Sequence, residues 1–234
     1  MSRRPTTREG VLLPRGKVVT GSNKLGFQLL SLRADDGAEE NVFISAFSVL
    51  LALAMTYNGA EGRTKAALAD LLGLGGLSLD EVNEGCKALM SLGDGLDPGV
   101  EIAMANAIWV REGIEPAQRF VETIREVYRG AFTSVDFGDP GTAEMINRWV
   151  AEQTKDRIQS LVTPDFIAMA IMVLTNAIFF KGVWASAFEE EQTRPMPFAL
   201  VDGATREHPM MSQEGTFAYL ETEHIQGVEL PYGD

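Results

Sequence analysis

The most constraining feature of the chain is an apolar segment, Ile171–Phe180, that carries one amide side chain, Asn176, near its middle. A turn through Gly182 follows, and Trp184 and Phe188 come after the turn. The length and apolar character of the segment predict a buried strand. Asn176 then needs a hydrogen-bond partner in its apolar surroundings, because an unpaired buried amide costs about 1–3 kcal/mol.

A second strand is expected over residues 100–110, where the sequence pattern has a period of two. Met104 and Ile108 fall on one side of this strand, and Ala107 and Trp109 fall on the other. Apolar residues on both sides predict a strand that is covered above and below.

The remaining pattern predicts helices and shorter strands in alternation. Helices are expected over 23–32, 49–57, 61–72, 79–92 and 142–161 and after Pro116, and strands over 41–44 and 131–137 and in short segments between 196 and 230. Ser78 and Glu81 have the spacing of a capping box at a helix start. Asn58 and Gly59 predict a left-handed stop at a helix end.

Composition excludes several classes of function. The 33 acidic and 20 basic residues give a net charge of −13, which would repel a nucleic acid at long range. The apolar fraction of 45% and the mean hydropathy of −0.01 indicate a folded chain. The basic N-terminus continues into polar residues, unlike a signal peptide, and no apolar run reaches the roughly 18 residues of a membrane span. The sequence therefore predicts no nucleic-acid partner and no membrane partner.

No pattern of residues indicates an enzyme. Cys86 is the single cysteine, which excludes an intrachain disulfide, and its helical context favours a quiet thiol over a nucleophile. His208 and His224 are the only imidazoles and lie in polar segments. There is no Gly-x-Ser-x-Gly turn and no set of histidines or cysteines with metal-ligand spacing. We expect no catalytic residues, no metal and no cofactor.

Several phrases of the sequence resemble serpins, and they occur in serpin order over residues 23–234. They are Asn41-Val-Phe-Ile-Ser45 with Ser48, Gly59-Ala-Glu-Gly62 with Thr64, Ala105-Asn106-Ala107, Ile146-Asn147-x-Trp149-Val150 with Thr154 and Ile158, the stretch from Asn176 to Phe188, Pro209-Met210-Met211, and Glu229-Leu-Pro231-Tyr232. One position departs from the family, because Ala46 stands where serpins usually have a proline.

The resemblance implies the α+β serpin fold, in which helices pack on a large central β-sheet A beside smaller sheets B and C. The organisation it implies is a flexible arm over residues 1–22 and a partial serpin domain over 23–234 that is incomplete at its C-terminus. The strands at 103–111 and 171–180 would be neighbours in sheet A, and the helix at 142–161 would lie across it.

The resemblance also assigns roles to particular residues. Ser45, Ser48 and Asn176 match the polar cluster called the shutter, which lies beneath the place where the central strands separate, and Trp184 matches the top of the sheet, where loop insertion starts. Two alternatives stay open, namely that the two serines only cap a helix and that Trp184 is ordinary core packing. The resemblance also marks residues of the family motifs that have a structural role, called the structural family positions below. They are Asn41, Gly59, Thr64, Asn147, Thr154, Gly182, Phe188 and Pro231.

The implied activity is inhibition of a serine endopeptidase, or alternatively of a cysteine protease. In serpins the protease cleaves an exposed reactive-centre loop, and the freed loop then enters the central sheet as an extra strand. That loop would follow Asp234. No glycosaminoglycan is expected as a partner, because the helix that some serpins use for it carries Asp80, Glu81 and Glu84 against Lys87.

Two readings of the function stay open at this point. In the first, residues 1–234 are the N-terminal portion of an inhibitory serpin. In the second, they act as a non-inhibitory binding or structural protein. The compartment is open as well, because serpins are frequently extracellular whereas the N-terminus lacks an export signal, which leaves the cytoplasm as the other location.

We predict that residues 1–234 by themselves form a poorly soluble or molten state unless a C-terminal complement is added. The reason is that a sheet ending at 171–180 would expose a long apolar edge, which is prone to aggregation. Calorimetry of the isolated polypeptide checks this prediction, and a sharp, reversible thermal transition would contradict it.

Overall fold

The computed structural model describes residues 14–35, 41–200 and 202–233. The helices are α1 (Pro14–Asp35), α2 (Ala46–Gly59), α3 (Gly62–Leu71), α4 (Leu79–Met90), α5 (Gln118–Glu126), α6 (Pro140–Gln153) and α7 (Pro164–Ile167), with 3-10 turns η1 (Ser91–Gly93) and η2 (Glu190–Gln192). The strands are β1 (Val100–Arg111), β2 (Ala131–Val135), β3 (Met172–Gly182), β4 (Arg194–Ala199), β5 (Thr205–Met210), β6 (Tyr219–Glu221) and β7 (Gln226–Val228).

The chain divides into two compact units. The larger unit contains Met1–Asp94 and Ala103–Phe179, and the smaller contains Gly95–Ile102 and Phe180–Asp234. Strands β1 and β3 each contribute residues to both units, so the division follows contacts within the fold and not a linker in the sequence.

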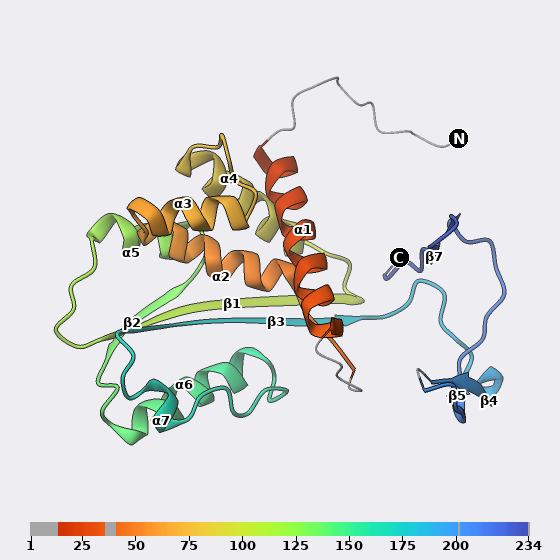
Figure 1. The fold of residues 1–234 in the computed structure, drawn as a ribbon. Helices are drawn as coiled ribbons and strands as arrows, with labels where there is room; N and C mark the ends of the chain where they lie inside the picture. The colour runs from red at the N-terminus through yellow and green to blue at the C-terminus, as the bar shows by residue number, and fades with distance from the viewer. Residues whose placement is uncertain (1–13, 36–40, 201, 234) are drawn as a thin grey trace. The chain divides into compact units, whose positions relative to one another are not determined.

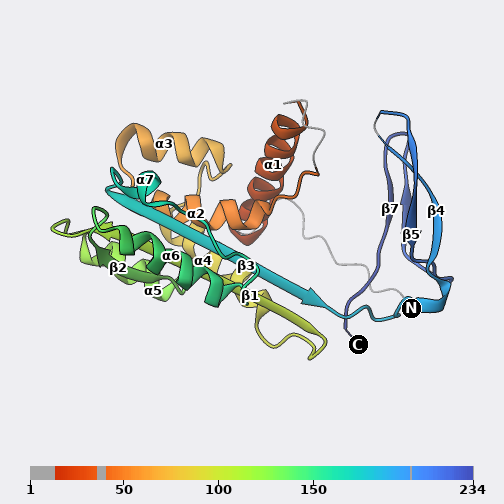
Figure 2. The same cartoon turned by 90° about the horizontal axis from the view of Figure 1, so that it is seen from below.

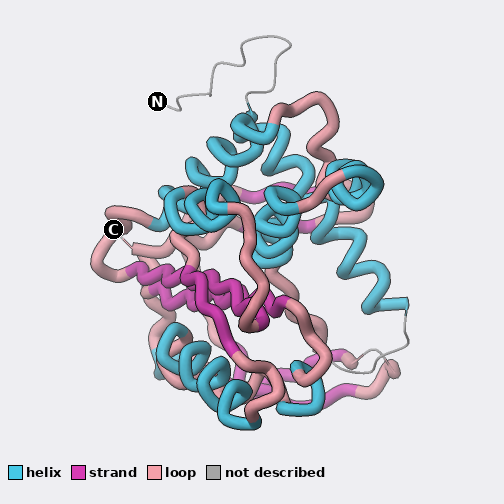
Figure 3. The backbone as a smooth tube through the Cα atoms, turned by 90° about the vertical axis from the view of Figure 1, so that its left-hand side faces the viewer, coloured by secondary structure: helices cyan, strands magenta, loops and turns pink. Residues whose placement is uncertain are grey.

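The larger unit is built on a three-stranded sheet with the order β2-β1-β3. Strands β1 and β2 are parallel, with Ala107 opposite Ala131 and Arg111 opposite Val135. Helices α2 to α5 lie on one side of this sheet and α6 and α7 on the other (Figure 1). Figure 2 places α6 and α7 on the viewer's side of the strands, and Figure 3 shows the strands between the two helical layers.

Burial along β1 confirms that this strand is covered on both faces. Ile108 belongs to the core under α2, α4 and α5, and Met104 packs against the same core. Ala107 and Trp109 point the other way, into a second core with Ile146 of α6. Each large apolar side chain that is buried in these cores stabilises the fold by roughly 1.5–3 kcal/mol.

The ends of α2 and α4 are set by local hydrogen bonds. The Ser45 hydroxyl accepts from the Ser48 N–H (3.2 Å) at the start of α2. Ser78 and Glu81 form the predicted capping box, and the hydrogen bonds from the Ser78 N–H and hydroxyl hold the pKa of the Glu81 carboxyl below its usual value. Gly59 does not make the left-handed stop expected of it, since a positive φ first appears at Gly62 (56°).

Two expectations near the N-terminus are wrong. Residues 14–22 were assigned to a loose arm, but α1 begins at Pro14; a proline suits the first turn of a helix, where its missing N–H is not needed. Residues 1–13 of the expected arm lie outside the described residues. The strand expected over 41–44 is not found, and Phe43 is 96% exposed, because no described segment supplies the backbone partner that a strand requires.

The helix expected over 142–161 is shorter than predicted and ends at Gln153. Lys155 and Asp156 have positive φ (50° and 60°), and the Asp156 N–H donates to the Ala151 carbonyl at 2.8 Å. This six-to-one bond closes the helix in the manner of a Schellman motif, with lysine where glycine is usual. The residues after it therefore run as an extended connection to α7 instead of a further helical turn.

The smaller unit holds two antiparallel hairpins. In the first, β4 pairs with β5 from Arg194 opposite Met210 to Ala199 opposite Thr205. In the second, β6 pairs with β7, and Tyr219 lies opposite Val228. In the described part of the chain, no helix has both the length and the apolar character needed to cross a bilayer.

We predict that Gly21→Ala lowers the free energy of unfolding by about 2–3 kcal/mol, because a Cβ on Gly21 would lie 2.0 Å from the Leu72 carbonyl oxygen. Urea denaturation of the protein expressed in full measures the change. Gly75→Ala is the matched control, since a Cβ there meets nothing within 4 Å, and we expect it to stay within about 0.5 kcal/mol of the original. Equal effects of the two substitutions would contradict the close packing of α1.

Candidate functional site

A chain of polar side chains, part-buried at Ser48 and Asn176 and buried at Asn106, joins α2 to the two central strands. The Ser48 hydroxyl donates to the Asn176 Oδ1, and the Asn176 Nδ2 donates to the Asn106 Oδ1 at 2.5 Å. Asn106 is only 1% exposed. Together with Ser45 these residues are called the α2–strand cluster below. The hydrogen bonds give partners to Ser48, Asn176 and Asn106, of which the buried Asn106 would be the most costly to leave unpaired.

The structure separates the roles of the two serines. Ser45 acts as the helix cap, as the simpler alternative proposed. Ser48, one turn into α2, directs its hydroxyl to Asn176 of β3, which lies 128 positions away in the sequence. The expectation that Ser48 and Asn176 come together agrees with this geometry, whereas Ser45 reaches Asn176 only through Ser48.

Sequence reasoning missed Asn106 as a member of this site. Asn106 was placed in a strand and in a family phrase, but no partner was assigned to it. Its position in the middle of an otherwise apolar strand was the available signal, the same signal that singled out Asn176. Only the pairing of β1 with β3 brings the two amides opposite each other.

On the opposite face of the same strands, Thr175 makes a separate contact. The Trp109 Nε1 donates to the Thr175 hydroxyl at 3.1 Å, and both side chains are buried. The Trp149 ring of α6 packs edge-on against Trp109, with a centroid distance of 5.8 Å. Strands β1 and β3 are thus linked by polar side chains on both faces.

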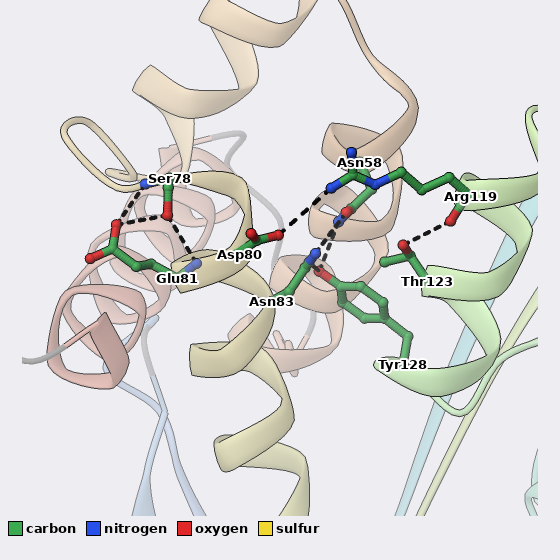
Figure 4. Close-up of polar contacts among 8 residues, drawn as sticks. All are labelled: Asn58, Ser78, Asp80, Glu81, Asn83, Arg119, Thr123 and Tyr128. Carbon is green, nitrogen blue, oxygen red and sulfur yellow. Dashed lines mark hydrogen bonds and ion pairs between the residues drawn. The ribbon is translucent and has the colours of Figure 1, made fainter.

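A second polar group, called the Tyr128 cluster, consists of the buried Asn83 and Tyr128 and the part-buried Asn58 (Figure 4). Asn58 and Asn83 exchange two amide hydrogen bonds of 2.9 Å, and the Tyr128 hydroxyl donates to the Asn83 Oδ1 at 2.9 Å. Burial raises the pKa of Tyr128, so the phenol remains a hydrogen-bond donor.

No sequence motif pointed to this cluster, because its members come from α2, α4 and the turn after α5.

Cys86 lies beside the Tyr128 cluster and has the properties expected of an inert thiol. It is fully buried, and burial raises its pKa to about 11, although the neighbouring Tyr128 hydroxyl opposes the shift. The thiolate that a nucleophile requires is therefore scarce at neutral pH. In the described residues, no group of three histidine, cysteine or acidic side chains could hold a metal ion.

Two of the structural family positions hold the connection after α6. The Asn147 side chain accepts from the N–H groups of Leu161 (2.8 Å) and Val162 (3.0 Å) and donates to the Val162 carbonyl (2.8 Å). The Thr154 hydroxyl donates to the Val150 carbonyl and accepts from the Ile158 N–H. Both polar side chains therefore replace backbone pairing where the helix has ended.

In the smaller unit, Trp184 lies in an aromatic cluster. Its ring stacks on Tyr232 at 4.2 Å and meets Phe188 edge-on at 5.8 Å. Pro231 accepts a backbone hydrogen bond from Ala185 at 2.9 Å. A Cβ on Gly182 would lie 2.5 Å from the Tyr232 ring, so glycine is needed for this close approach.

The remaining family positions lie outside these clusters. Asn41 and Thr64 are exposed. Gly59 faces the Phe120 ring, where an added Cβ would come within 3.0 Å.

His208 and His224 are exposed in the smaller unit, as their polar segments suggested.

Comparison with known proteins gives a consistent result. The sequence profile of the family described as Serpin (serine protease inhibitor) matches residues 20–234. An uncharacterized serpin-like protein from Thermococcus kodakarensis is 36% identical over 232 residues, covering 97% of this chain and 54% of that protein.

Solved structures agree with the sequence comparison. Ovalbumin from emu (Dromaius novaehollandiae) superposes with a TM-score of 0.85 at 25% identity, over 92% of this chain and 60% of the other. A serine protease inhibitor from Manduca sexta, serpin-12, superposes with a TM-score of 0.80 at 26% identity, over 91% of this chain and 60% of the other.

The chain spans about half the length of the curated relatives it matches. The match nevertheless includes both central strands, the helices on either side of them and the hairpins of the smaller unit. The arrangement is the α+β fold that the resemblance implied. On these grounds the chain belongs to the serpin family.

Proposed function

We propose that the protein inhibits serine endopeptidases, and that a cleaved loop enters its central sheet as an additional strand. The observation that carries the proposal is the α2–strand cluster, in which α2 holds both central strands through side chains. The description of the matching family names serine protease inhibition, and so does the name of the relative from Manduca sexta.

The chemistry of the cluster suits a sheet that must move over a helix. A hydroxyl can rotate, and an amide offers both donors and acceptors, so Ser48 and Asn176 can exchange partners when β3 shifts. Interlocked apolar side chains in their place would resist such a shift, because packed cores do not deform continuously. In this proposal Ser45, Ser48 and Asn176 form the shutter, and Asn106 is its fourth member.

The position of β3 supports strand addition. Within the described residues, β3 is the last strand in the order β2-β1-β3, and β1 covers its other edge. The backbone groups along the outer edge of a terminal strand can pair with an added strand. Trp184 follows the end of β3 in sequence, and we assign it to the place where insertion begins.

We predict that the protein, expressed in full from its gene, forms a covalent complex with a trypsin-like or subtilisin-like serine protease. An acyl bond that persists after loop insertion survives denaturation, so a denaturing gel should show a band at the summed mass of the two partners. The same protease with its catalytic serine chemically blocked is the control and should give no such band.

Cleavage without a complex, with the protease still active, would contradict inhibition and favour a binding or structural role. Reading the gene beyond the codon for Asp234 gives an independent check. A hinge of small residues followed by an exposed loop is expected there under the proposal.

We further predict that Ser48→Ala and Asn176→Ala are energetically coupled. Each substitution removes a hydrogen-bond partner, from the part-buried Asn176 in one case and from Ser48 and the buried Asn106 in the other. Each should lower the free energy of unfolding by about 1–3 kcal/mol, with a coupling of about 1 kcal/mol in the double variant. Urea denaturation of the protein expressed in full gives all four values. Ser78→Ala combined with Asn176→Ala is the control pair and should be additive within about 0.5 kcal/mol. Additive effects of Ser48→Ala and Asn176→Ala would contradict a direct hydrogen bond between these two side chains.

A further inference from the structure

From the Ser48 hydroxyl onward, the side-chain hydrogen bonds of the α2–strand cluster run in one direction. Ser48 donates to Asn176, Asn176 donates to Asn106, and the Asn106 Nδ2 donates to the backbone carbonyl of Tyr128 at 2.8 Å. The series therefore ends on a residue whose side chain belongs to the other buried group, the Tyr128 cluster. Tyr128 therefore contacts both clusters, through its carbonyl on one side and its hydroxyl on the other.

The terminal carbonyl fixes the orientation of every group before it. A carbonyl oxygen can only accept, so Asn106 must turn its NH₂ toward Tyr128 and its oxygen toward Asn176. Asn176 must then present its NH₂ to Asn106 and its oxygen to Ser48. The Ser48 hydroxyl, which could otherwise donate or accept, is left with the role of donor.

Several contacts fix the position of the Tyr128 carbonyl. The Tyr128 side chain is fully buried, and its hydroxyl is held by Asn83 (2.9 Å) and Asn58 (3.1 Å). The next residue, Arg129, has a positive φ of 50° and pairs with both oxygens of Asp94, at 2.8 and 2.5 Å. The turn at Tyr128 is thus tied to α2, to α4 and to the residue that follows η1.

We propose that Tyr128 is a positioning residue that couples the two clusters. Its hydroxyl, anchored on α2 and α4, sets the place of its carbonyl and thereby the strength of the bond between Ser48 and Asn176. Helix α2 is engaged at both ends, by Ser48 near its start and by Asn58 near its end. A displacement of α4 that weakens the bond between Asn83 and Tyr128 then reaches the central strands.

This inference does not depend on protease inhibition, because it concerns the strength of one hydrogen bond. The test compares the coupling between Ser48→Ala and Asn176→Ala in the original protein and in a Tyr128→Phe background, with the protein expressed in full. In the original protein we expect the coupling to change the unfolding equilibrium by a factor of about 5. In the Tyr128→Phe background we expect a factor below about 2.

Thr142→Val is the matched control background. It removes another buried hydroxyl of the larger unit, which donates to the Asp136 carbonyl at 2.6 Å and bonds to neither cluster. A loss of coupling with Tyr128→Phe but not with Thr142→Val supports the proposal. Unchanged coupling in the Tyr128→Phe background overturns it, and so does an equal loss in both backgrounds, since that would reflect general loosening. If Tyr128→Phe does not fold, Asn83→Ala removes the acceptor of the same hydroxyl and provides the same comparison.

Discussion

The pairing of the amides of Asn106 and Asn176 is the constraint on which the larger unit depends. Helices lie on both faces of the sheet, and each central strand carries an asparagine, which is buried at Asn106 and part-buried at Asn176. An unpaired buried amide costs about as much as one large apolar side chain contributes by burial. The two strands must therefore lie in the register that brings Asn106 to Asn176, and α2 must present Ser48 at the same level.

The same cluster differs in chemistry from the packing around it. Apolar side chains hold the layers together on both sides of the sheet, whereas the contact between α2 and β3 at Ser48 is polar. Polar contacts can change partners without opening a cavity, which apolar packing cannot do. The proposed function, in which the sheet accepts an additional strand, requires this property.

Local signals in the sequence were reliable where a few neighbouring residues decide the structure. The capping box of Ser78 and Glu81 and the two-sided burial around Ile108 follow from spacing alone. Predictions failed where a distant segment decides. Residues 41–44 lack a described strand partner, and α6 ends at Gln153 because its last turn closes through residues with positive φ. Neither cause is visible in the periodicity of apolar residues.

The sequence by itself determined the family, the order of most helices and strands, and the demand that Ser48 and Asn176 find partners. Only the tertiary structure decided which residues are those partners. Asn106 joins Asn176 because β1 pairs with β3, and Tyr128 ends the series because the turn after α5 brings its carbonyl to β1. Hydrogen-bond demand is a property of each residue, whereas its satisfaction depends on distances between segments far apart in the chain, which folding alone sets.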